Sequence, residues 1–294
     1  MNVAISGASG LIGSKLVAAL TAGGHSVRRL VRKSTGAGGE ILWDPNGSVD
    51  SKALEGIQAV IHLAGENISQ RWNPESKARI HDSRARGTLT LCQAVAALET
   101  PPEVFVSSSA IGYYGDRGAE TLNEESGPGK GFLAEVCVDW EKAAEPASAR
   151  GIRVVNIRTG IGLDPAGGAL AKMLRPFRLG AGGRVGNGSQ YWSWIAMDDV
   201  VGAFREAITN KELRGAVNAT SPNPVTNAEF TKVLAEVLKR PAIFPMPAFA
   251  ARLALGEMAD ALLLASARVL PARLIAAGYQ FRFPDLEGAL RHML

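Results

Sequence analysis

The apolar and polar positions of the first thirty residues predict a strand, a turn, a helix and a second strand, in that order. Val3 to Ile5 form a short apolar run with β-branched side chains, which predicts a buried strand. The glycine-rich turn GASGLIG follows, and residues 11–20 repeat apolar side chains at helical spacing. A Gly-Gly pair ends this helix, and Ser26 to Val31 predict the next strand. The chain therefore opens with a β-α-β unit.

The same alternation continues through the first half of the chain. Further strands are predicted at residues 40–43, 59–63, 104–106 and 153–158, and helices at residues 74–98 and 132–149. Asn73 and Pro74 supply a cap and a first-turn proline for the longer helix. Alternating strands and helices predict an α/β fold with a doubly wound parallel sheet.

The pattern loosens after Gly160. Seven glycines between residues 167 and 188 indicate a loop-rich excursion around a short helix at 170–177. Beyond it the pattern predicts strands at 192–195 and 216–219, and helices at 198–208 and 226–238. Residues 248–270 mix apolar positions with four charged ones, which predicts an amphipathic helix.

Composition narrows the class of protein. No apolar run in the 294 residues reaches the roughly 18 residues that a membrane span needs, so we expect no membrane partner. The net charge of +4 is mild and its basic residues are scattered, which favours a small anionic ligand over nucleic acid. Cys92 and Cys137 lack metal-ligand spacing, so we expect packed thiols, a cytoplasmic protein and no metal site.

The glycine turn is typical of a dinucleotide-binding fingerprint, because it joins a strand to a helix. Gly7 permits the tight turn, Gly10 allows a pyrophosphate to approach the backbone, and Gly13 allows the helix to pack close to the strand. The phosphates would bind the free N–H groups at the helix N-terminus. The alternative is a glycine-rich turn that binds no ligand.

Two cations follow the second strand, where an NAD-binding protein places an acidic residue on the ribose. Arg32 and Lys33 stand there, and residues 2–39 contain no Asp or Glu. A guanidinium and an ammonium would pair with a 2′-phosphate, so the pattern favours NADP. Two solvated surface cations are the alternative.

Small and hydroxyl-bearing residues end two further strands. Leu63, Ala64 and Gly65 follow the run AVIH and would let ribose and phosphate lie close to the backbone. The serines at 107–109 end the run VFV, where hydroxyls face the ligand crevice of such a sheet. Arg84 could reach the phosphates from the helix at 74–98.

Several motifs together identify a resemblance. GASGLIG, HLAGENI and FVSSSAIGYYGD resemble the extended short-chain dehydrogenase/reductases, the sugar-nucleotide epimerase and dehydratase group. The chain is most similar to an atypical branch called epimerase family proteins. Its marks include WDP at 43–45, WEKAA at 140–144, RTGIGL at 158–163 and the C-terminal LPARLIAAGYQFRFPDLEGAL, so the resemblance covers essentially the whole chain.

The resemblance implies a Rossmann domain that binds NADP, at residues 1–160 plus about 191–215. It implies a smaller substrate domain at about 161–190 and 216–294. It also places Ile161 near the nicotinamide end and leaves a homodimer possible. With the residues above, the expected cofactor contacts are Gly7, Ser9, Gly10, Leu11, Ile12, Gly13, Arg32, Lys33, Leu63, Ala64, Gly65, Arg84, Ser107, Ser108 and Ile161.

Two departures from the family pattern concern chemistry. The group uses a Tyr-x-x-x-Lys pair, and the alignment through Glu141 puts Leu133 and Cys137 at those positions. Neither can take a hydroxyl proton as a lysine-assisted phenolate does. Ser109 keeps its family position, whereas Ala196 stands where the branch has a histidine.

Two functions follow. The first is an NADP-dependent oxidoreductase or epimerase acting on a hydroxyl, carbonyl or nucleotide-sugar-type small molecule. Ser109 would polarise the carbonyl, and Tyr113 or Tyr114 would replace the missing acid/base, although packing under the cofactor is their simpler role. Tyr191, Trp192 and Trp194 would line the substrate pocket. The alternative is a non-catalytic NADP-binding sensor or regulatory protein.

Overall fold

The structure, a computed structural model, describes residues 1–294, which form two compact units. The first comprises residues 1–109, 136–158 and 201–217, and the second residues 110–135, 159–200 and 218–294. The chain thus crosses between the units several times. The division drawn from the sequence differs from these units mainly at residues 110–135 and 191–200, which group with the second unit.

The first unit contains the large sheet and its covering helices. Its elements are β1 (Asn2–Ser6), α1 (Leu11–Ala22), β2 (Ser26–Val31), β3 (Glu40–Leu42), η1 (Lys52–Leu54), β4 (Ala59–His62), α2 (Pro74–Ala96), β5 (Val104–Ala110), α3 (Phe132–Lys142), α4 (Glu145–Ala149), β7 (Arg153–Thr159), α6 (Met197–Thr209) and β11 (Gly215–Ala219), of which β5, α3, β7, α6 and β11 each continue into the second unit. The strand order is β11-β7-β5-β4-β1-β2-β3. The pairs β1–β2, β1–β4, β2–β3 and β4–β5 are parallel.

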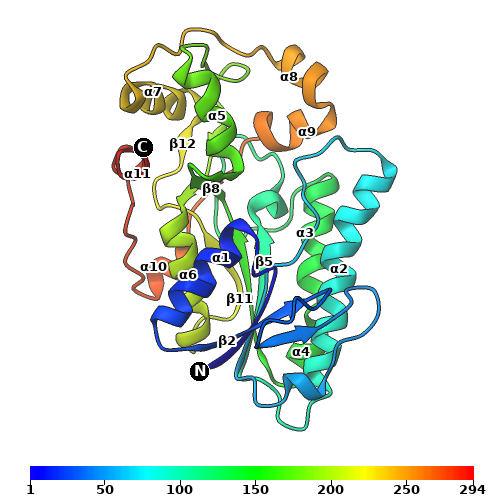
Figure 1. Cartoon of the computed structure of the whole chain (residues 1–294). Helices are drawn as coiled ribbons and strands as arrows, with labels where there is room; N and C mark the ends of the chain where they lie inside the picture. The colour runs from blue at the N-terminus through cyan, green and yellow to red at the C-terminus, as the bar shows by residue number, and fades with distance from the viewer. The chain divides into compact units, whose positions relative to one another are not determined.

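The central strands are apolar throughout because helices cover both faces of the sheet. Every residue of β4 is buried, as are four of the five in β1. Figure 1 shows α2, α3 and α4 on one face and α1 and α6 on the other. On the first face, Ala4 and Phe105 of the sheet pack with Leu91 and Val95 of α2 and with Ala147 of α4. The predicted doubly wound, Rossmann-type sheet is confirmed.

The strand order indicates where a ligand crevice is expected in this sheet. From β1 the chain winds outward through β2 to β3, and it then returns to β4 on the other side of β1. In open α/β sheets, ligands bind outside the carboxyl ends of the strands at such a reversal. The turns after Ser6 of β1 and His62 of β4 meet at this place.

The second unit contains shorter elements. They are η2 (Ile111–Tyr114), β6 (Thr121–Leu122), β8 (Ile161–Asp164), α5 (Gly168–Arg178), β9 (Tyr191–Trp192), β10 (Trp194–Ala196), β12 (Val225–Thr226), α7 (Asn227–Leu238), α8 (Ala248–Leu255), α9 (Glu257–Ala259), the π-helix η3 (Asp260–Leu264), β13 (Arg268–Val269), α10 (Ala272–Ala276) and α11 (Leu286–Met293). Its strands pair two by two, as β8–β10, β9–β12 and β6–β13.

Two predicted helices are wrong in extent. The helix expected at 132–149 is two helices, because the chain breaks before Glu145 and restarts with Pro146 in its first turn. The helix expected at 248–270 ends at Gly256, which has φ +61. Residues 268–269 instead pair with β6, and Val269 is fully buried there. None of the helices is both long and apolar enough to span a membrane.

Candidate dinucleotide-binding and catalytic site

The three glycines of the first turn have different steric surroundings. Gly7 has φ +67, and a Cβ atom there would lie 2.8 Å from the carbonyl carbon of Leu63. A Cβ atom at Gly13 would overlap the Gly7 carbonyl oxygen and lie 2.9 Å from the Cα atom of Ala8. A Cβ atom at Gly10 meets only the Gly7 oxygen, at 3.3 Å. Gly7 and Gly13 therefore serve the fold, whereas Gly10 leaves open space above an exposed backbone.

The N-terminus of α1 presents amide groups beside this open space. Gly10 is the N-cap residue and makes no side-chain cap hydrogen bond, and no acidic residue lies in the first turn. The N–H groups of Leu11 and Ile12 have no intrahelical acceptor at this position. Ser9 and Gly10 are exposed. These predicted cofactor contacts therefore lie together at the positive end of the helix, where an anion is stabilised.

A buried serine ties the ends of β1 and β4 together. The hydroxyl of Ser6 accepts hydrogen bonds from the amides of Leu63 (3.1 Å) and Ala64 (3.3 Å). Its oxygen also lies 2.6 Å from Nδ1 of His62. Since both acceptor positions of Ser6 are used, its proton points to Nδ1, and His62 carries its own proton on Nε2. Sequence reasoning missed this pair.

His62 is neutral in the folded protein. Its ring is fully buried, edge-on to Trp43 with the centroids 5.6 Å apart, and Nε2 has no hydrogen-bond partner. Burial, and secondarily the charge of Arg84, lowers the pKa of His62 from 6.5 to about 4. The residue therefore positions the predicted Leu63 and Ala64 contacts through Ser6.

Arg84 and Gly65, both predicted contacts, touch each other. The carbon of the Arg84 guanidinium would be 3.2 Å from a Cβ atom at Gly65. The guanidinium lies over the ring of Trp140, 5.0 Å from the centroid. Its Nη1 donates to the carbonyl oxygens of Glu66 and Ile80, at 3.0 and 3.1 Å. Burial lowers the pKa of Arg84.

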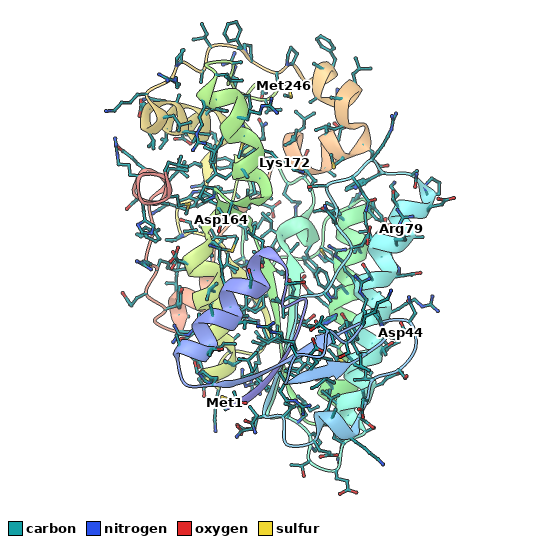
Figure 2. All side chains as sticks on the ribbon, in the orientation of Figure 1. Met1, Asp44, Arg79, Asp164, Lys172 and Met246 are labelled. Carbon is teal, nitrogen blue, oxygen red and sulfur yellow. The ribbon has the colours of Figure 1, made fainter.

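Arg32 and Lys33 are exposed at the end of β2 and neither makes an ion pair. Arg32 borders a hollow of about 380 Å³ that Trp43, Asp44 and Asp50 also line. Both carboxylates accept backbone amides, Asp44 from Asn46 and Asp50 from Ala53. Asp44 lies on the loop after β3 (Figure 2). The Arg32 guanidinium therefore stays available for an anion.

The three serines end β5 in different environments. Ser107 and Ser109 are buried, whereas Ser108 is partly exposed. Ser109 donates its hydroxyl proton to Oε1 of Glu141, at 2.7 Å. Arg158 holds both oxygens of the same carboxylate, with nitrogen–oxygen distances of 2.7 and 2.8 Å. In this arrangement the hydroxyl proton is directed to Glu141, which leaves the oxygen as an acceptor and disfavours the expected donation to a carbonyl.

In the second unit the adjacent tyrosines differ. Tyr114 is fully buried, and its hydroxyl oxygen lies 2.9 Å from the Asn123 carbonyl oxygen and 2.8 Å from Oδ1 of Asn218, so these two acceptors share its one proton. This geometry indicates a packing role for Tyr114 and disfavours the role of acid/base that the sequence analysis considered for it. Tyr113 packs edge-on against Tyr114 and remains partly exposed.

The three aromatic residues at 191–194 also differ in their exposure. Trp192 and Trp194 are buried in the core of the second unit with Ala196, so they do not line a pocket as expected. Ile161 is partly buried against that core. Tyr191 is partly exposed and lies under the guanidinium of Arg268, 5.1 Å from the ring centroid.

Arg268 has no carboxylate partner. Its Nε atom is buried and makes no hydrogen bond, and the residue forms no ion pair. A partly buried guanidinium in this state is free to bind an anionic group. Sequence reasoning counted Arg268 only as a polar position of an amphipathic helix.

Comparison with known proteins shows the family of this chain. Residues 3–219 match the model of the NAD dependent epimerase/dehydratase family, and residues 246–293 match a domain of unknown function, DUF1731. The chain belongs to this epimerase/dehydratase family. An epimerase family protein of Mycobacterium bovis is 45% identical over 98% of the chain and 96% of its own length. The resemblance inferred from the motifs is confirmed.

Solved structures show the same fold in other family members. The human epimerase family protein SDR39U1, crystallised with NADPH, has 33% identity and a TM-score of 0.92, covering 100% of this chain and 99% of that one. A nucleoside-diphosphate sugar epimerase from Corynebacterium glutamicum has 41% identity and a TM-score of 0.84, covering 100% of this chain and 58% of that one. The similarity to these two proteins therefore extends over the whole chain.

Proposed function

We propose that this epimerase/dehydratase family member binds NADP(H) and acts as an oxidoreductase or epimerase on a hydroxyl, carbonyl or nucleotide-sugar-type substrate in the cytoplasm. The observation that carries the proposal is the turn after β1. Its glycines bring backbone amides to the carboxyl edge of the sheet, with the unpaired cations Arg32 and Lys33 at the end of the next strand. NADPH would donate the hydride, or NADP+ would accept it, when bound.

The residues fit such a cofactor by their space and charge. The open surface at Gly10 and the amides of Leu11 and Ile12 would hold the pyrophosphate. Arg32 and Lys33 would hold the 2′-phosphate, since neither has a carboxylate partner in the structure. NADPH in the human relative supports the same choice.

Ser109 and Glu141 offer a route for a proton in place of the Tyr-Lys pair. Helix α3 contains no tyrosine, and its one lysine is its last residue. Ser109 Oγ would accept the proton of a substrate hydroxyl while its own proton passes to Oε1 of Glu141. Arg158 would hold the carboxylate in position through its two hydrogen bonds. Tyr113 is the second candidate for this proton.

Within the second unit, Arg268 is the candidate for binding an anionic group. Arg268, stacked on Tyr191 and without an ion pair, fits a phosphate or carboxylate of the substrate. This proposal agrees with the relatives that are named as sugar-nucleotide epimerases, such as the Corynebacterium glutamicum protein.

A non-catalytic NADP-binding sensor is the second candidate. The observation that favours it is the hydrogen bond of the Ser109 hydroxyl, whose proton is already directed to Glu141. A sensor would bind the nucleotide through the same turn and need no proton route.

Transfer of label from 4-deuterated NADPH separates the two functions. The full chain is incubated with the labelled cofactor and a panel of carbonyl compounds and nucleotide sugars. Deuterium in a product establishes hydride transfer, and we then expect Ser109→Ala and Glu141→Gln to lower kcat while NADPH affinity stays within twofold. Tight NADPH binding without label in any product would favour the sensor.

A further inference from the structure

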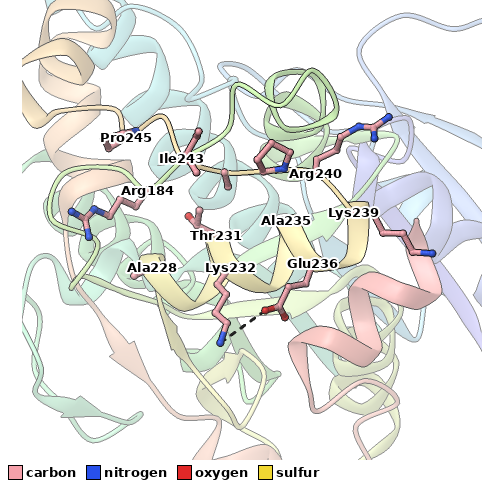
Figure 3. Close-up of a pocket in the computed structure, with 12 residues that line it drawn as sticks. Arg184, Ala228, Thr231, Lys232, Ala235, Glu236, Lys239, Arg240, Ile243 and Pro245 are labelled. Atoms are coloured by element: carbon pink, nitrogen blue, oxygen red, sulfur yellow. Dashed lines mark ion pairs between the residues drawn. The ribbon is translucent and has the colours of Figure 1, made fainter.

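A hollow of about 800 Å³ lies within the second unit, along α7. One wall is α7, and the other is the segment at residues 239–245 that follows it (Figure 3). Ala228, Ala235 and Ala242 line it with short apolar side chains, which we call its floor, and Ile243 lines it too. We call this feature the α7 groove. It is separate from every residue assigned to the cofactor or the substrate.

The segment beside the groove is held by backbone hydrogen bonds. The amide of Phe244 donates to the carbonyl of Gly182 at 3.1 Å, and that of Met246 donates to the carbonyl of Arg184 at 2.8 Å. The carbonyl of Met246 in turn accepts from Gly186 at 2.9 Å. These bonds fix the wall of the groove before any partner arrives, which lowers the entropy lost on binding.

Large apolar side chains gather on this fixed segment and on α8. Ile243, Phe244, Met246, Phe249 and Leu253 are 72, 60, 44, 71 and 85% exposed. They are half of the ten exposed large apolar side chains of the chain, within eleven residues. Met246 is labelled in Figure 2 between α7 and α8. Exposed apolar side chains in such density indicate an interaction surface.

The charge around the groove is positive. Four cations and one carboxylate line it: Arg184, Lys232, Lys239, Arg240 and Glu236. The carboxylate lies 3.9 Å from the ammonium nitrogen of Lys232, so that pair is neutralised. Arg184 and Lys239 are exposed and form no ion pair. The groove therefore has unpaired positive charge beside an apolar floor.

Lys239 adds a conformational observation. It is the only residue other than glycine with positive φ, at φ 52 and ψ 46, and it is the C-cap of α7. Glycine is the usual residue in this left-handed position. The chain instead keeps a cation at the end of the groove, in a backbone state that disfavours it.

We propose that the α7 groove binds an acidic, amphipathic peptide segment of a partner protein. The apolar face of the segment covers the floor and Ile243, and its carboxylates meet Arg184 and Lys239. Nucleic acid would not use the apolar side chains, and a flat membrane would not enter the hollow.

A peptide library tests the proposal with the full-length chain. Random 14-residue peptides displayed on phage are selected on the wild-type protein and counter-selected on the double variant Arg184→Glu/Lys239→Glu. We expect enriched peptides to combine Asp or Glu with apolar residues at i, i+3 and i+4. Dissociation constants of the synthetic peptides are then measured by fluorescence anisotropy.

Variants separate binding from folding. Lys239→Gly removes the cation and relieves the left-handed strain, so we expect weaker peptide binding, at least fivefold, with an unchanged or higher Tm. The double variant should lose at least tenfold, and Ile243→Ser should also weaken binding. Lys211→Glu, which changes an exposed cation of the first unit, is the matched control and should bind normally.

The outcomes either support or overturn the proposal. Enrichment of acidic amphipathic peptides, with the losses above and unchanged NADPH affinity, supports it. Failure to enrich peptides, or enrichment of peptides without acidic residues, overturns it. Saturable binding of vesicles containing 30% phosphatidylserine, lost in the double variant, would assign the surface to membranes and also overturn it. NADPH binding tests the proposed function independently.

Discussion

At the residue scale, the neighbouring backbone leaves no room for a side chain at the two outer glycines of the first turn. The middle glycine, by contrast, faces open space. Gly13 faces the Gly7 carbonyl so closely that no Cβ atom fits, whereas Gly10 has φ −73 and ψ 175, which any residue adopts. Substitutions at the two positions should therefore affect different properties. One should change the stability of the fold, and the other should change ligand binding.

We expect Gly10→Val to fold with a Tm close to that of the wild type and to lose NADPH binding, because its side chain fills the space for the pyrophosphate. Gly13→Ala should instead lower the free energy of unfolding by about 1–3 kcal/mol through overpacking. Thermal unfolding and NADPH fluorescence titration measure both effects. Retained affinity in folded Gly10→Val would contradict the assignment of this turn.

His62 makes stability depend on pH. Its folded pKa of about 4 lies below the unfolded value near 6.5, so the unfolded chain binds this proton more readily. Stability is therefore fully present above about pH 6.5 and falls as the pH drops toward 4, by up to about 3 kcal/mol. Urea unfolding between pH 7 and 4.5 should show a shallower decline in His62→Gln. An equal decline in both proteins would rule out this histidine as the cause.

At the element scale, the start of α2 is specified locally. The side chain of Asn73 accepts from the Ser76 amide at 2.7 Å, and the Ser76 hydroxyl accepts from the Asn73 amide at 2.8 Å. This capping box and Pro74 explain why the predicted start of the helix is correct. Helix α2 then positions the side chain of Arg84 beside Gly65.

We expect Asn73→Ala to lower the free energy of unfolding by about 1 kcal/mol, since it removes one reciprocal cap. The variant should keep its NADPH stoichiometry, because the rest of α2 packs on the sheet. Asn46→Ala, in the exposed turn after β3, is the matched control. Chemical denaturation of the two variants side by side measures the difference, and equal stabilities would contradict the role of the cap.

At the scale of the whole molecule, the groups proposed to bind the cofactor belong to one compact unit. The first unit has the glycine turn, Arg32 and the Ser109–Glu141 pair. A ligand that binds only the folded state stabilises the whole chain by mass action. Cofactor choice can therefore be measured on the intact protein.

We expect saturating NADP to raise the Tm of the wild type more than NAD does. Arg32→Ala should weaken NADP binding by roughly 1–3 kcal/mol and leave NAD almost unchanged, because only the 2′-phosphate loses a charge-assisted contact. Lys211→Ala, an exposed cation of the same unit, should behave as wild type. Equal losses for both nucleotides would contradict the NADP assignment.

The sequence alone determined the doubly wound sheet, the glycine turn and most cofactor candidates, because apolar periodicity and glycine spacing are local. It also placed the start of α2 through its cap. The long helices at 132–149 and 248–270 were wrong in extent. Pro146 and Gly256 are local signals for the two breaks, whereas the pairing of β13 with β6 depends on a distant segment.

Only the tertiary structure decided what each polar side chain does. It buried Tyr114 against Asn218, joined Ser109 to Glu141 and Arg158, and left Arg268 without a carboxylate. These partners lie between 17 and 104 residues apart in the chain. Burial and hydrogen bonding between such distant residues arise from packing, and no local pattern of side chains encodes them.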